Sequence, residues 1–148
     1  MVFGYDRGME ITKEQQNMAE EVVKKRGLEF VVVFGSRANG KAKKDSDLDI
    51  GVSDPQPETY RRQGELFNDF SNIFKGINVD LRMIRGAEPV FLYNALCKGK
   101  FLAGNKHDFY NYKFFAYKNF VDSKPLFELK TKILRKQQEL LKQKIKYA

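Results

Sequence analysis

The sequence predicts an α/β (α+β) fold, in which a small mixed β-sheet is flanked by helices. Three observations predict it. Short runs rich in β-branched or apolar residues, at 29–34, 47–52 and 77–84, have the composition of strands. Longer segments between and after these runs carry apolar residues at helical spacing. Gly or Pro stands at most of the boundaries, so the elements can be placed in order along the chain.

The first third of the chain reads as one helix followed by two strands. A capping box at Thr12 predicts a helix that runs to about Lys25 and ends at Gly27. The run EFVVVF at 29–34 is unbroken in apolar character, which is typical of a central strand buried on both faces. A glycine turn follows it, and residues 47–52 predict the second strand.

The middle of the chain predicts helix, strand, helix and a short edge strand. Pro55 is expected to open a helix that Gly76 closes, because proline favours the first helical position. Residues 77–84 alternate between apolar and polar side chains, as a strand with one buried face does. Pro89 starts another predicted helix, and residues 101–103 predict an edge strand. The stripe of the first of these helices is apolar at Leu66, Phe67, Phe70, Ile73 and Phe74.

The chain after Gly104 is predicted to be helical to its end, with a boundary before Pro125. Its aromatic stretch, 109–120, is expected to form helix core in preference to lining a pocket. The last segment carries apolar residues that recur at three, four and seven positions. This pattern predicts packing on the same domain or on a partner helix. The residues are Leu126, Leu129, Ile133, Leu134, Leu140, Leu141 and Ile145.

Composition narrows the functional classes. No apolar run approaches the roughly 20 residues that a membrane span needs, so no membrane association is expected. A single cysteine, Cys97, fits a reducing cytoplasm and excludes an internal disulfide. The formal net charge is +8, and residues 97–148 hold 13 Lys and Arg against 4 Asp and Glu. Such a basic segment suits nucleic acid, an acidic protein or a nucleotide, and a solvated helix face explains it equally well.

Two carboxylates stand two residues apart on the second predicted strand. Alternate side chains of a strand share a face, so Asp47 and Asp49 should point the same way, with Leu48 and Ile50 in the core. Carboxylates this close repel each other, and a cation is needed to keep both ionised. Mg²⁺ suits the pair because it takes carboxylate oxygens together with phosphate and water. On its own this D-x-D pattern is a weak signal.

The surrounding residues make the signal more specific. Asp80 lies on the polar face of the strand at 77–84, and it can complete a two-metal site if the two strands are neighbours. Gly35 and Ser36 form a turn whose backbone N–H groups can hold phosphate. Arg37 and Lys41 stand on the same loop and can screen the phosphate charge.

The joint pattern closely resembles the nucleotidyltransferase superfamily with the DNA polymerase beta-like fold. It consists of a strand, Gly35-Ser36, a ten-residue gap, Asp47-Leu48-Asp49 and a later single carboxylate. Within the superfamily it is most similar to the minimal nucleotidyltransferases (MNT), above all the MNT antitoxins paired with HEPN toxins. The resemblance is strong over residues 28–85. It implies one domain, 1–148, with this catalytic core and a helical extension at about 105–148.

The resemblance also implies a role for each residue. Asp47 and Asp49 would bind two Mg²⁺ ions, and Asp80 would bind one of them and help deprotonate the acceptor hydroxyl. Gly35 and Ser36 would hold the β- and γ-phosphates. One position departs from many members, because an asparagine stands at position 39 where they carry arginine, which removes one possible phosphate contact.

The function implied is an antitoxin that transfers AMP from ATP to a hydroxyl, expected to be a tyrosine, of a HEPN-type toxin. Two alternatives stay open. One is a small-molecule adenylyltransferase of the aminoglycoside or lincosamide type, and the other is a non-catalytic antitoxin that acts by binding. Nucleic-acid polymerisation is disfavoured, because the chain has no thumb-like or template-binding domain.

Overall fold

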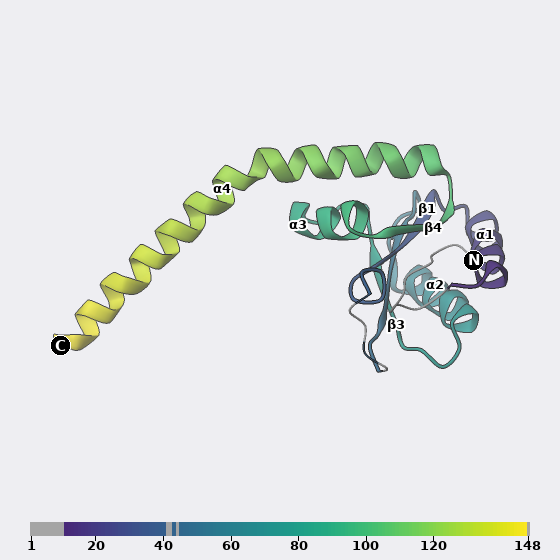
Figure 1. The fold of residues 1–148 in the computed structure, drawn as a ribbon, viewed down its shortest axis with the longest axis horizontal. Coiled ribbons are helices and arrows are strands. Elements are labelled where there is room, and N and C mark those ends of the chain that lie inside the picture. Colours follow the sequence, from purple (N-terminus) through teal and green to yellow (C-terminus); the bar gives the residue numbers. More distant parts are fainter. Residues whose placement is uncertain (1–10, 41–42, 44, 148) are drawn as a thin grey trace.

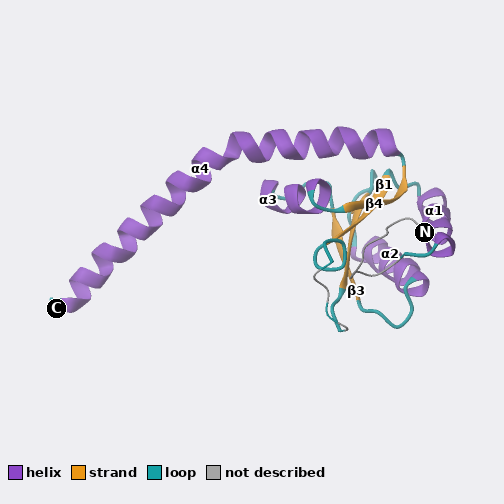
Figure 2. Cartoon of the chain, viewed as in Figure 1, coloured by secondary structure: helices purple, strands orange, loops and turns teal. Residues whose placement is uncertain are grey.

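The computed structural model describes residues 11–40, 43 and 45–147, and it has helices on both faces of a four-stranded mixed sheet (Figures 1 and 2). The strand order is β3-β2-β1-β4. β1 is antiparallel to β2 and β4, whereas β2 and β3 are parallel. This architecture confirms the predicted fold class. In chain order the elements are α1 (Lys13–Arg26), β1 (Phe30–Phe34), β2 (Leu48–Ser53), α2 (Tyr60–Ile73), β3 (Val79–Met83), α3 (Pro89–Leu92), the π-helical segment η1 (Tyr93–Cys97), β4 (Lys100–Gly104) and α4 (Lys106–Lys146).

The central strand β1 is buried on both faces, as its unbroken apolar run predicts. Val31 and Val33 belong to one core cluster, which includes buried side chains of α1 and α2. Phe30 and Val32 belong to a second cluster, with buried side chains of α3, η1 and the first part of α4. The alternation of β1 therefore separates two layers of helices, one on each face of the sheet (Figure 2).

The helix α2 begins later than the sequence predicts. Pro55 does not open it; the helix starts at Tyr60, and the Thr59 side chain accepts a hydrogen bond from a backbone N–H of the first turn. Before it, the Asp54 carboxylate accepts from the Gln56 backbone N–H and closes a turn at the end of β2. The capping threonine and this turn together outweigh the preference of proline for a helix start.

A network of partly buried charges around the buried Asp54 fixes α1 and α2 to the end of β2. The Arg62 guanidinium donates two hydrogen bonds to the Asp54 carboxylate, which is 2% exposed, at 2.9 and 3.2 Å. Arg62 also donates to the backbone carbonyl of Arg26. Arg26 in turn contacts Asp69 at 2.8 Å and Glu65 at 3.0 Å, and both acids lie on α2. The network sets where α2 lies relative to β2 and β3, the strands that carry the predicted carboxylates.

The helix α4 is continuous, so the boundary expected before Pro125 is wrong. Proline lacks a backbone N–H and its ring crowds the preceding turn, and such a residue bends a helix without having to end it. Figure 1 shows α4 bending part-way along and leading away from the body of the domain. Although α4 has 41 residues, neither it nor any other described helix is apolar enough over sufficient length to cross a bilayer.

The aromatic stretch 109–120 is only partly core. Phe109 is buried on the sheet, and its ring meets that of Phe30 edge-on with centroids 5.7 Å apart. Phe114 and Tyr117 are 70% and 54% exposed and line a shallow hollow beside η1, together with Tyr93 and Cys97. The expectation of helix core therefore holds for the side facing the sheet and fails for the others.

Candidate active site

Asp49 and Asp80 lie directly beside each other on neighbouring strands. In the parallel register of β2 and β3, Asp49 pairs with Asp80, and the two side chains therefore share a face of the sheet. Leu48 and Ile50 are fully buried on the opposite face, as predicted. The structure thus brings together two carboxylates that are 31 positions apart in the sequence.

The pKa of Asp49 is raised above that of an ordinary aspartate. Burial is the largest cause, because it disfavours the charged form, and the neighbouring Asp80 adds repulsion and a hydrogen bond that favours a bound proton. The charge of Asp47 raises the pKa further, whereas the Arg82 guanidinium lowers it. Negative charge is therefore concentrated around Asp49, and a cation bound there would relieve it.

Asp47 stands at the rim of this cluster. It precedes β2 by one residue and its side chain is exposed, yet its negative charge helps to raise the pKa of Asp49. Within residues 11–40, 43 and 45–147, no three His, Cys, Asp or Glu side chains are close enough together to form a preformed metal cage. The donors themselves fit Mg²⁺, because carboxylate oxygens are its preferred protein ligands and Asp49 and Asp80 lie side by side in the register of β2 and β3. The chain thus presents a two-carboxylate centre with Asp47 as a neighbouring donor.

Gly35 is packed directly against the Asp49 carboxylate. A Cβ atom at this position would lie 2.0 Å from Asp49 Oδ2 and 3.0 Å from Cγ, distances that no side chain can occupy. The backbone of Gly35 also has φ +74°, in the left-handed region that favours glycine. Both constraints act together, so glycine is favoured where the turn after β1 meets the carboxylate of β2, and a larger residue would displace that carboxylate.

The loop after Gly35 is a turn. The Ala38 and Asn39 backbone N–H groups both donate to the Gly35 carbonyl at 3.2 Å, and Ser36 lies inside this turn. Arg37 braces the loop, because its Nε donates to the Ser46 carbonyl at 2.8 Å just before β2. The phosphate contacts expected of Ser36 and Arg37 remain predictions. Lys41, the other residue predicted to contact phosphate, lies outside the described residues.

Arg82 shares the exposed face of β3 with Asp80. Its Nε lies 3.7 Å from Asp80 Oδ1, and both side chains are roughly half exposed. The guanidinium also lies over the ring of Phe91, 6.0 Å from its centroid. Arg82 is therefore placed to orient the Asp80 carboxylate.

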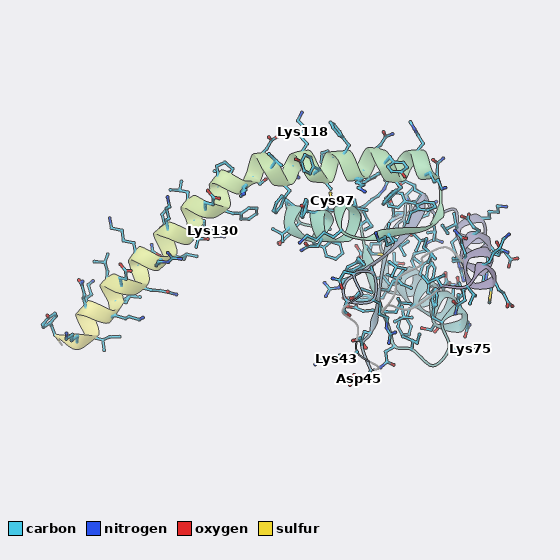
Figure 3. The ribbon with its side chains drawn as sticks, viewed as in Figure 1. Lys43, Asp45, Lys75, Cys97, Lys118 and Lys130 are labelled. Atoms are coloured by element: carbon cyan, nitrogen blue, oxygen red, sulfur yellow. The ribbon has the colours of Figure 1, made fainter. Side chains whose placement is uncertain are left out.

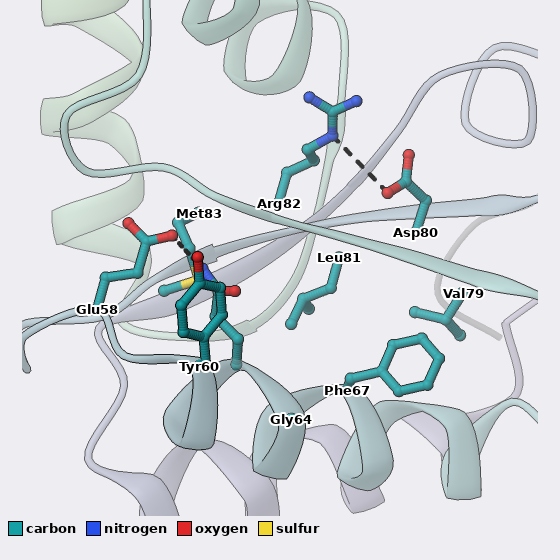
Figure 4. A pocket seen from close by; sticks show the side chains of 10 residues that line it. Glu58, Tyr60, Gly64, Phe67, Val79, Asp80, Leu81, Arg82 and Met83 are labelled. Carbon is teal, nitrogen blue, oxygen red and sulfur yellow. Dashed lines mark hydrogen bonds and ion pairs between the residues drawn. The ribbon is translucent and has the colours of Figure 1, made fainter.

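A groove of about 510 Å³ runs between α2 and the outer edge of β3, and Asp80 is part of its wall (Figure 4). Tyr60, Gly64 and Phe67 line it from α2. Figure 4 shows Asp80 and Arg82 on one side of β3, with Phe67 on the other, beside α2. The groove offers a second molecule access to Asp80 from the edge of the sheet.

Sequence reasoning missed the α2 wall of this groove. Phe67 fits the apolar stripe of α2 loosely and is assigned to the core, yet it is 44% exposed, while Leu66 and Phe70 are fully buried. Leu66 and Phe70 are four residues apart and share a face, and Phe67 lies one position, or 100°, around the helix from Leu66. The available signal in the sequence was this offset, together with Tyr60, which precedes Phe67 by seven residues and therefore lies on the same face of α2.

A sequence model of the polymerase beta nucleotidyltransferase family matches residues 16–108. This segment contains all four strands and the Gly35, Asp49 and Asp80 cluster. The chain belongs to this family. No curated protein sequence gives a significant match.

Solved structures of toxin–antitoxin pairs show the same nucleotidyltransferase fold. A toxin–antitoxin with AMP-PNP superposes with a TM-score of 0.63 at 20% identity, over 76% of this chain and 95% of that chain. The MntA–HpeT toxin–antitoxin with two Asp-to-Glu substitutions gives 0.62 at 18% identity, over 76% and 95%. A tri-AMPylated Shewanella oneidensis HEPN toxin in complex with MNT antitoxin gives 0.55 at 20% identity, over 77% and 96%. The predicted likeness to MNT antitoxins is confirmed at the level of the fold.

Proposed function

We propose that this nucleotidyltransferase is a Mg²⁺-dependent antitoxin that transfers AMP from ATP to a tyrosine hydroxyl of a HEPN-type toxin. The observation that carries the proposal is the pairing of Asp49 with Asp80 directly beside the Gly35 turn. This juxtaposition puts an acidic centre and a turn suited to phosphate at one place on the sheet. The toxin–antitoxin structures with AMP-PNP and with an AMPylated toxin support this choice of nucleotide and acceptor.

The reaction is an in-line displacement at phosphorus. The acceptor oxygen forms a bond to the α-phosphorus of ATP, and the bond from that phosphorus to the bridging oxygen of the β-phosphate breaks. Pyrophosphate leaves, and the hydroxyl proton passes to the Asp80 carboxylate and then to solvent. Arg82 keeps that carboxylate oriented toward the acceptor.

Asp47, Asp49 and Asp80 would hold two Mg²⁺ ions, which supply positive charge to the triphosphate and to the acceptor oxygen when bound. The raised pKa of Asp49 supports this assignment, because carboxylates crowded together in the free protein gain from a bound cation. Gly35 and Ser36 would hold the β- and γ-phosphates through backbone N–H groups and the serine hydroxyl, with Arg37 and Lys41 screening their charge.

The acceptor tyrosine would enter through the groove between α2 and β3. Its ring can lie against Tyr60 and Phe67, which are 95% and 44% exposed and form the apolar side of the groove. Its hydroxyl would reach Asp80 around the edge of β3, because Asp80 belongs to the wall of the same groove but lies on the other side of that strand from Phe67. The groove is open at the sheet edge, which suits an acceptor that is part of another protein.

The test is to mix the protein with the product of its neighbouring gene, ATP and Mg²⁺, and to measure intact masses. We expect the partner to gain one or more AMP units. Asp49→Asn and Asp80→Asn should abolish the gain, whereas Asp45→Asn, an exposed acid of the same loop, should leave it unchanged. A partner mass that does not change would count against the proposal.

Two other functions have their own discriminating tests. An antitoxin that acts by contact alone is favoured by the length of exposed α4, and a double variant Asp47→Asn with Asp49→Asn that still neutralises the toxin fully would establish it. A small-molecule adenylyltransferase is favoured only by the open groove. Pyrophosphate release with an aminoglycoside or lincosamide panel, and none with the neighbouring protein, would establish that function.

A further inference from the structure

The distal part of α4 forms an arm, residues 124–147, that stands clear of the domain (Figures 1 and 3). Every residue of the arm is exposed. Large apolar side chains are among them: Leu126, Ile133 and Leu141 are 69%, 48% and 58% exposed. The family match ends at residue 108, so the arm lies outside the part of the chain that resembles other nucleotidyltransferases in sequence.

The apolar side chains of the arm form one stripe with a seven-residue repeat. Six of them come in adjacent pairs, which are Leu126 with Phe127, Ile133 with Leu134, and Leu140 with Leu141, while Leu129 and Ile145 stand outside these pairs. Seven residues make nearly two turns of a helix, so successive pairs lie on the same face. A stripe of this kind is the surface with which a helix packs against another helix.

Polar side chains stand inside this stripe at the same repeat. Lys130 is three or four residues away from each member of the first pair, Leu126 and Phe127, and of the second pair, Ile133 and Leu134. Residues at this spacing are neighbours on one face of a helix, so Lys130 lies between the two pairs. Gln137 and Lys144 occupy the equivalent positions one and two repeats later. A helix packed on the stripe would therefore bury or cover two ammonium groups, which need acceptors.

The spacing of these lysines disfavours pairing with a second copy. In a parallel pair with the stripes fully overlapped, Lys130 faces Lys130 and Lys144 faces Lys144. In the antiparallel pair Gln137 faces Gln137, and Lys130 faces Lys144 of the other copy. Both arrangements bring like charges together inside an apolar contact, and the arm adds to the repulsion with eight Lys and Arg against two Glu.

We propose that the arm binds an amphipathic helix of a different protein, which presents carboxylates fourteen residues apart toward Lys130 and Lys144 and apolar residues toward the pairs around them. This docking surface is separate from the site of nucleotidyl transfer and does not depend on the proposed function. Charge complementarity selects the partner, and the apolar pairs supply the contact area.

Two synthetic helical peptides of equal length and equal apolar content test the proposal. One carries Glu and the other Lys at the positions that would meet Lys130 and Lys144, and binding to the full-length protein is measured by fluorescence anisotropy. We expect the acidic peptide to bind about tenfold more tightly than the basic one, with a preference that declines as salt is raised. The double variant Lys130→Glu with Lys144→Glu should invert the preference.

A matched control removes the same charge from the opposite side of the arm. Lys132 and Lys146 follow Lys130 and Lys144 by two positions, which is 200° around the helix, so Lys132→Glu with Lys146→Glu should keep the preference for the acidic peptide. Equal binding of both peptides, or equal loss in both double variants, would overturn the proposal. So would sedimentation of the free protein as a stable dimer that the Lys130→Glu and Lys144→Glu variant alone disrupts.

Discussion

Replacing Gly35 by alanine is expected to damage the site far more than the same substitution at Gly40. Both glycines have left-handed backbones, with φ +74° and +76°. Adding a Cβ at either position should lower the free energy of unfolding of the protein by about 1–2 kcal/mol. Only Gly35 also has a neighbour in the way, because its Cβ would lie 2.0 Å from Asp49 Oδ2, whereas nothing lies within 4 Å of a Cβ at Gly40.

The Asp49 carboxylate must therefore move by more than about 1 Å in Gly35→Ala to restore an ordinary contact distance. A displacement of that size at a reacting centre costs about a hundredfold in rate. Urea unfolding measures the common loss of stability, and calorimetric titration with ATP and Mg²⁺ measures the site. We expect Gly40→Ala to bind ATP as the unmodified protein does and Gly35→Ala to lose Mg²⁺-dependent binding. Equal behaviour of the two variants in both assays would refute the role assigned to Gly35.

Three further predictions concern stability and shape. In EDTA, Asp49→Asn should be more stable than the unmodified protein, and the difference in unfolding free energy should grow as pH rises above about 4. The reason is that the pKa of Asp49 is raised in the folded protein, so the folded state loses stability as this carboxyl deprotonates. A difference that does not change with pH in urea titrations would contradict this prediction. Arg62→Leu should lose about 3–5 kcal/mol at neutral pH, because it leaves the buried Asp54 unpaired, and adding Asp54→Asn should restore part of the loss measured by urea unfolding. Pro125→Ala should straighten α4 and therefore increase the maximum dimension of the protein in small-angle X-ray scattering, without changing its affinity for ATP. An unchanged maximum dimension would show that Pro125 does not cause the bend.

The pairing at the centre of the site follows from local periodicity, which is why the sequence predicts it. Strand alternation alone puts Asp49 opposite the buried Leu48 and Ile50, and it puts Asp80 on the polar face of its own strand. The only further requirement is that β2 and β3 be neighbours, and their parallel register meets it.

Features that depend on tertiary contacts cannot be predicted from the local periodicity of the sequence. The start of α2 is set by Thr59 and by the Arg62–Asp54 ion pair, and it differs from the preference of Pro55 that sequence alone reveals. The close approach of Gly35 to Asp49 joins two strands across a turn, so no pattern within either strand predicts it.

The most direct test of the central claim is a crystal of the protein grown with Mn²⁺ and a non-hydrolysable ATP analogue. Mn²⁺ replaces Mg²⁺ at oxygen ligands and is located by its anomalous scattering. We predict an anomalous peak within coordination distance of both Asp49 and Asp80, with the triphosphate beside Gly35. A nucleotide bound elsewhere, or a Mn²⁺ peak that neither carboxylate contacts, would contradict it.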